Sequence, residues 1–147
     1  MTDSDPGPAA PHSLESAIAA IREAFGWSAQ TQMVSDTAGK LDEEGLAASL
    51  MALEFGKADD MRVCLPGLLS EFARRMDDPG AAGLTEDLLV FLVLAAEAHR
   101  GDLARLGSDR LRSLERFARA IGLRFESERG EQAEYVADCL AGLIAEN

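Results

Sequence analysis

Residues 88–96 read Leu-Leu-Val-Phe-Leu-Val-Leu-Ala-Ala, the longest uninterrupted apolar run in the chain. The run is about half as long as a membrane span requires, so we expect it in a protein core. Just before it, Thr85 is suited to cap a helix, and Glu86 and Asp87 favour the positive end of a helix dipole. Because a helix that is apolar on every side must be surrounded by protein, we predict a central helix over about 85–99.

Five further segments carry apolar residues at the spacing of a helix face, and β-branched residues do not alternate as they do in strands. Ser13, Asp42 and Ser108 stand where helix N-caps are expected. Proline is favoured at a first helical position, so one helix is expected to begin at Pro66, with the preceding residues as a kinked extension. The predicted fold is all-α, a single domain over 13–147 built as a compact bundle of about six helices. The five segments are 13–25, 42–56, 66–76, 108–122 and 131–145.

Two of the predicted helices carry a similar pattern 45 positions apart. Residues 69–74 read Leu-Ser-Glu-Phe-Ala-Arg, and residues 114–119 read Leu-Glu-Arg-Phe-Ala-Arg. The helices that follow them align at the same offset, which indicates two similar αα-hairpins over 66–100 and 108–145. The alternative is a chance likeness between two helices of the same composition, since repeat proteins need about three copies.

The remaining segments are less regular. Residues 26–40 are compatible with a loop or with a short helix. Within them, Trp27, Met33 and Val34 are expected to fold back onto the core. Residues 1–12 hold three prolines but neither a basic nor an apolar region. We therefore expect a flexible tail there rather than a signal peptide.

Two cysteines, Cys64 and Cys139, lie among apolar neighbours on predicted helices. This setting is typical of small buried residues in a reducing compartment, and no secretory feature supports a disulfide. Neither cysteine stands in a zinc-binding spacing. We therefore expect a cytoplasmic protein.

The charge of the chain is strongly unbalanced. There are 14 Lys and Arg residues against 26 Asp and Glu residues, which gives a net charge of −12. Such a chain repels phosphate backbones and anionic lipid surfaces, so neither nucleic acid nor a membrane is an expected partner. A protein partner with a basic face is the better match.

Residue types that carry most enzyme chemistry are scarce. The two histidines are His12, in the predicted tail, and His99, which suits the negative end of the central helix. Acidic pairs stand at helix starts and in loops, where they cap and solvate, and no phosphate loop, nucleophile elbow or metal motif occurs. We therefore expect no catalytic residue, no cofactor and no metal site, and no enzyme activity.

Positive charge is concentrated in one region. Residues 100–129 hold eight Arg and five acidic residues, so this segment carries +3 while the rest of the chain carries −15. Three of these arginines stand at i, i+4 and i+7 and share one helix face. We take four arginines as candidate partner-binding residues, with a solvated, charge-balanced helix face as the alternative. They are Arg105, Arg112, Arg116 and Arg119.

Together these features predict a non-enzymatic protein–protein interaction module of the inhibitor, immunity, antitoxin or adaptor type. It would dock a partner through segregated acidic and Arg-rich surfaces. One alternative is a self-associating helical protein that forms a homo-oligomer. Another is a bundle that binds a small ligand in a pocket between helices, lined by Trp27, Met51, Met61, Phe72 and Phe91.

Overall fold

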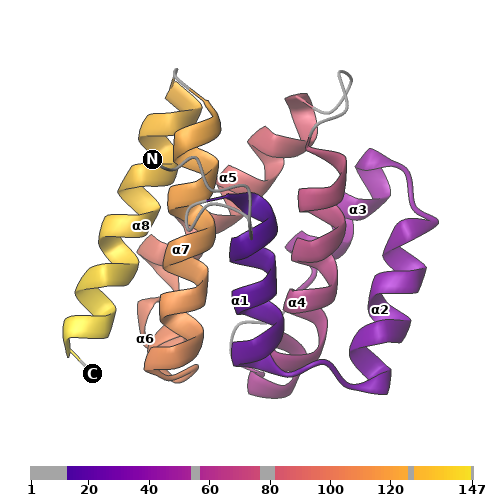
Figure 1. Ribbon diagram of the computed structural model, residues 1–147, viewed down its shortest axis with the longest axis horizontal. Coiled ribbons are helices and arrows are strands. Elements are labelled where there is room, and N and C mark those ends of the chain that lie inside the picture. Colours follow the sequence, from indigo (N-terminus) through magenta and orange to yellow (C-terminus); the bar gives the residue numbers. More distant parts are fainter. Residues whose placement is uncertain (1–12, 54–56, 77–81, 126–127, 147) are drawn as a thin grey trace, which may run out of the picture.

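The computed structural model describes residues 13–53, 57–76, 82–125 and 128–146, and the regular structure in these ranges is α-helical (Figure 1). The predicted all-α class is confirmed. The predicted tail over 1–12 lies outside the described residues. Within the described ranges there are eight helices rather than about six: α1 Leu14–Phe25, α2 Ala29–Gly39, α3 Glu43–Met51, α4 Ala58–Arg75, α5 Ala82–Ala98, α6 Arg100–Ala104, α7 Ser108–Arg124 and α8 Glu128–Glu146.

Two of the four predicted capping residues, Ser13 and Asp42, cap helices. The other two predictions are wrong: Ser108 is the first residue of α7, which follows Gly107, and Thr85 lies inside α5, which begins at Ala82. The Ser13 hydroxyl accepts the Ser16 N–H at 3.0 Å, and the Asp42 carboxylate accepts the Gly45 N–H at 2.7 Å. These bonds satisfy backbone donors that have no partner within the helix. The segment left open between loop and helix forms α2, which Ser28 caps in the same way. The two additional helices are therefore α2 and the short α6.

One helix begins earlier than predicted. α4 runs continuously through Pro66, eight residues after its start at Ala58. Met61 and Leu65 are buried on the part that precedes the proline. Their burial explains why the helix extends backward, although proline removes one intrahelical hydrogen bond.

The helices are arranged in space in an order different from the sequence. α7 packs extensively on α8 and also on α1, while α4 packs on α1 and on α2. In Figure 1, α8 and α2 accordingly lie at opposite edges, with α7, α1 and α4 between them. α5 lies behind this row, against α8 and α3. The core between these layers includes the fully buried side chains of Ile21, Leu69, Phe72, Leu89, Phe117 and Ile121.

α5 is not enclosed on every side, contrary to the prediction from its composition. Leu88, Leu89 and Phe91 are buried, but Val90 is 56% exposed and Leu94 is 46% exposed. α1 packs between α4 and α7 instead of against α5, which leaves one side of α5 uncovered by the described helices. α4 and α5 also share little contact, whereas α7 and α8 pack closely. The predicted central helix and the two similar hairpins are therefore not confirmed.

α2 approaches α4 closely at a glycine. A Cβ atom at Gly67 would lie 3.0 Å from the carbonyl oxygen of Thr31 and 3.2 Å from the backbone nitrogen of Ser35. The buried residues of α2 are also small, namely Thr31 and Ala38. The contact between these two helices thus depends on close backbone approach and buries little apolar surface.

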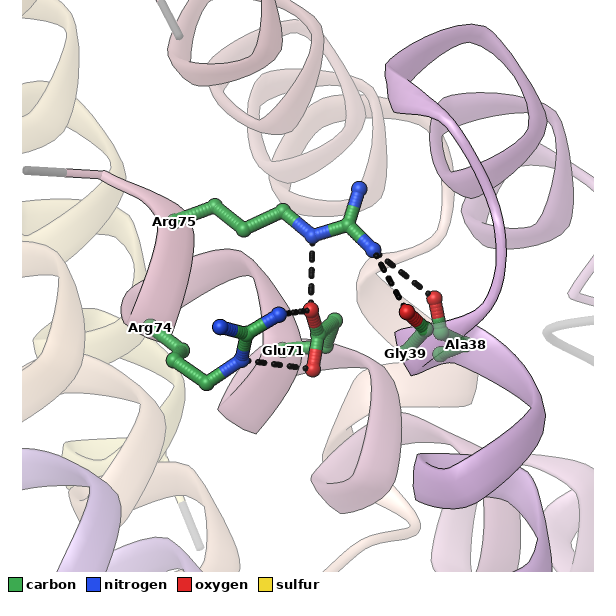
Figure 2. A network of polar contacts seen from close by, with 5 residues as sticks. All are labelled: Ala38, Gly39, Glu71, Arg74 and Arg75. Carbon is green, nitrogen blue, oxygen red and sulfur yellow. Dashed lines mark hydrogen bonds and ion pairs between the residues drawn. The ribbon is translucent and has the colours of Figure 1, made fainter. Parts of the chain in front are cut away.

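Polar side chains of α4 fasten the last turn of α2 (Figure 2). Glu71 is 6% exposed, and its carboxylate accepts hydrogen bonds from Arg75 Nε at 2.6 Å and from Arg74 Nε at 3.1 Å. Arg75 Nη2 in turn donates to the carbonyl oxygens of Ala38 at 3.0 Å and Gly39 at 3.4 Å. The Ala38 carbonyl also accepts the Leu41 N–H at 3.1 Å, so Arg75 adds a charged donor at a helix end whose carbonyls carry partial negative charge. We call Glu71, Arg74 and Arg75 the α4 clamp.

The carboxylate of the clamp is held in its charged form. Burial acts to raise the pKa of Glu71, but the hydrogen bonds and positive charges of Arg74 and Arg75 outweigh it. The pKa of Glu71 therefore lies below its ordinary value of 4.5.

We expect Glu71→Gln to lower the free energy of unfolding near neutral pH by about 1–3 kcal/mol, because Arg75 loses a charged acceptor. The lowered pKa of Glu71 means that its stabilisation is complete above the ordinary carboxyl pKa. That stabilisation is lost as the pH falls through the lower pKa of the folded state. Urea unfolding at neutral pH and at progressively lower pH should show the difference from wild type shrinking.

The matched control for this experiment is Glu23→Gln, on the exposed side of α1. It should change the free energy of unfolding by no more than about 0.5 kcal/mol at any pH. A Glu71→Gln penalty that is absent, or that does not depend on pH, would contradict the role assigned to the clamp.

Two glycine substitutions test the close approach of α2 and α4. Gly142 lies inside α8, and a Cβ atom there meets nothing within 4 Å. Gly142→Ala should raise the free energy of unfolding by about 0.5–1 kcal/mol through helix propensity alone. Gly67→Ala should gain less than this, and Gly67→Val should be less stable than wild type, because the added atoms meet the α2 backbone. Equal gains from the two alanine variants in thermal unfolding would disprove the close contact.

Candidate functional site

An open groove of about 900 Å³ lies between α2, α3 and α4. Most of its lining side chains are apolar or small, and polar groups stand among them. The lining residues are Gln30, Met33, Val34, Thr37, Ala38, Leu41, Ser49, Leu53, Asp60, Val63, Cys64 and Leu68. We call this feature the α2–α4 groove.

The spacing of the lining residues follows from helix geometry. On α2 and just beyond its end, they recur at intervals of three and four residues and so form a single stripe from Gln30 to Leu41. On α4 an interval of four residues joins Asp60, Cys64 and Leu68, and Val63 lies three residues after Asp60. Two helical stripes therefore form most of the lining, and Ser49 of α3 and Leu53 complete it.

The groove exposes apolar surface. Met33, on α2, is 68% exposed, and Val34, Leu41 and Leu53 are only partly buried. The prediction that Met33 folds back onto the core is wrong, because α2 seats small residues against α4 and turns this long side chain outward. Apolar surface gathered in a concave site is typical of a binding surface.

The charged and ionisable groups of the lining are few. Asp60 contributes a carboxylate, Cys64 contributes a thiol, and no Lys, Arg or His is among the lining residues in the described ranges. Burial, reinforced by the charge of Asp60, raises the pKa of the Cys64 thiol above its ordinary value. A protonated thiol is a poor nucleophile, so the arrangement favours binding over covalent chemistry. Cys64 and Cys139 are both free thiols.

Two of the four candidate arginines make contacts that join helices. Arg119 Nη2 lies 2.9 Å from the Glu115 carboxylate, and Arg119 Nη1 lies 3.1 Å from that of Glu134 on α8. Arg116 donates a hydrogen bond to the hydroxyl of Ser16 on α1. The close packing of α7 with α8 and α1 brings these partners together, which could not be read from the spacing of the arginines alone.

The other two candidate arginines are more exposed. Arg112 is 63% exposed and lies 3.4 Å from Asp109, one turn away on α7. Arg105 is 74% exposed and lies 3.6 Å from Asp102. Arg112 and Arg116 share a separate groove between α1 and α7, but neither Arg105 nor Arg119 lines it. The structure thus does not gather the four arginines into one site.

The predicted ligand pocket is not formed by the residues proposed for it. Met61, Phe72 and Phe91 are core residues, each no more than 3% exposed. Met51 is 43% exposed on α3, and Trp27 stacks against Arg22, whose guanidinium carbon lies 3.9 Å from the ring centroid. The stripe of α2 that lines the observed groove was missed because residues 26–40 were not assigned to a helix. Its signal was the spacing of Met33, Val34, Thr37, Ala38 and Leu41.

Another contact joins the helices at the opposite edge. The Tyr135 hydroxyl on α8 donates to the Glu97 carboxylate on α5 at 2.6 Å. This hydrogen bond, with smaller effects from Cys139 and burial, raises the pKa of Tyr135 to about 12. The phenol therefore stays protonated at neutral pH and acts as a tie between α5 and α8.

In the described ranges, no three His, Cys, Asp or Glu side chains are arranged to hold a metal ion. None of the described helices is both long and apolar enough to cross a membrane. Comparison with protein-family models, with curated proteins and with solved structures found no match to this chain.

Proposed function

We propose that the chain is a non-enzymatic protein–protein interaction module that binds an apolar segment of a partner protein in the α2–α4 groove. The observation that carries this proposal is the open groove itself, with Met33 68% exposed beside it. Removing such surface from water contributes a favourable term of about 25 cal/mol per Å² of apolar area, which is offset in part by the freedom that the partners lose on association. The side chains that line the groove include no catalytic pair of a base and a nucleophile in hydrogen-bond contact.

The charge distribution supports a partner of opposite sign. The chain carries −12, and the charged side chain of the groove lining is Asp60. Long-range attraction of a basic partner raises the rate of encounter, while the apolar groove supplies affinity. Of the predicted Arg-rich surface, Arg105 and Arg112 are the members exposed enough to contribute a second contact.

A random-peptide display library tests this function without assuming a partner. Wild-type protein should enrich a set of peptides, and Met33→Asp should weaken their binding at least about tenfold, equivalent to ~1.4 kcal/mol. The carboxylate places an uncompensated charge where apolar side chains must dock. Fluorescence anisotropy with the enriched peptides measures the change.

The matched control is Leu94→Asp, which places the same charge at an exposed apolar position of α5, outside the groove lining. Its affinity for the enriched peptides should stay within about twofold of wild type. The proposal is wrong if the library yields no binder, or if Met33→Asp and Leu94→Asp lower affinity equally.

A further inference from the structure

The helical walls of the groove specify the form of its occupant. We propose that the segment bound in the α2–α4 groove is an amphipathic α-helix with an apolar stripe and basic flanking residues. This inference rests on the proposed function of the groove and adds the conformation and charge of the partner segment.

Hydrogen bonding favours a helix over an extended segment. The groove is lined by α2, α3 and α4, whose backbone N–H and C=O groups are bonded within their own helices. An extended peptide binds tightly when it adds to an open sheet edge, and the described ranges contain no strand that would supply one. In a helix-lined groove its backbone groups would lose water without gaining partners, which is costly. A helix satisfies its own backbone and presents only side chains.

The side chains of the two helical walls also have the spacing that packs against a further helix. The stripe on α2 includes Met33 and Thr37, and the stripe on α4 includes Cys64 and Leu68. Side chains at intervals of three and four form ridges and grooves that accept the same spacing from a neighbouring helix. The expected ligand therefore anchors residues at i, i+3 or i+4, and i+7.

The charge of the groove and of the chain indicates which residues flank the apolar stripe of the bound helix. Asp60 stands in the lining with no Lys or Arg among the lining residues, and the thiol of Cys64 beside it is neutral. Asp60 is half-buried in the first turn of α4, where the helix dipole favours its charge, and a ligand Arg or Lys would add a charge-assisted hydrogen bond to it. The net charge of −12 acts in the same direction at long range and opposes occupation by a second copy of this chain.

The test uses three synthetic peptides of equal length with a fluorescent label. The first is an amphipathic sequence with Leu at i, i+3, i+4 and i+7 and Arg at the flanks of the stripe. The second replaces every Arg with Glu. The third has the composition of the first with two prolines placed inside the helix, which prevents helix formation. We expect the first peptide to bind at least about tenfold more tightly than either of the others.

Substitutions in the protein separate groove binding from general attraction between opposite charges. Met33→Asp makes the chain more acidic, so it would strengthen non-specific binding of a basic peptide but should weaken groove binding about tenfold. Asp60→Asn should weaken binding of the first peptide about fivefold and reduce the dependence of its affinity on salt concentration. Asp87→Asn removes the same charge from an exposed position of α5 and should leave affinity within about twofold.

The outcomes distinguish this inference from the function on which it rests. Suppose that library peptides bind the wild-type chain but not Met33→Asp, and that the proline peptide binds as well as the helical one. The inference of a helical occupant is then wrong, and the proposed function stands. If the Glu peptide binds equally well, the basic flanks are wrong. A dimer in light scattering that dissociates when the helical peptide is added would show that a second copy occupies the groove, which would overturn the basic occupant. If neither the library peptides nor the designed peptides bind, both proposals are wrong.

Discussion

The position of α2 depends on its close backbone approach to α4. The α2–α4 groove exists because α2 lies in that position. Gly67 lets the two backbones approach, and Arg75 of the α4 clamp bonds the carbonyls that end α2. Glu71 balances the charge of Arg75, and these two side chains are only 6% and 11% exposed. Since this contact is made by small residues and polar bonds, α2 is held without burying its longest apolar side chain, Met33. The apolar surface of the groove remains available for that reason.

Several arginines of this chain form contacts between helices, while others are exposed on the surface. Arg75 fastens α2, Arg116 joins α7 to α1, and Arg119 joins α7 to α8. An arginine can bond several oxygens at once in a planar arrangement, which suits it to contacts between helices. Positive charge that is concentrated in the sequence is therefore partly neutralised inside the fold. The chain as a whole keeps its acidic excess of −12, which would attract the basic partner proposed above.

Binding of an amphipathic helix would extend the architecture already present. α2 packs on α4 at one edge of the row of helices (Figure 1). Both helices line the groove, so a further helix bound there would contact both. The occupant would bury apolar side chains against Val63 and Leu68, much as the helices of the domain pack on one another. The uncovered side of α5, with Val90 and Leu94, is a different surface whose occupant no feature of the described ranges indicates.

The sequence by itself determined the helical class, the absence of strand patterns, and several helix starts. Caps such as Ser13 and Asp42 act within one turn, so local spacing is enough to predict them. It did not determine which helices become neighbours, because an apolar stripe specifies a buried face but not the helix that covers it. The composition of residues 88–96 thus predicted an enclosed helix, whereas packing left Val90 exposed. Tertiary structure alone decided that Arg119 is bonded to α8 and that α2 and α4 enclose a groove, since both depend on residues distant in the chain.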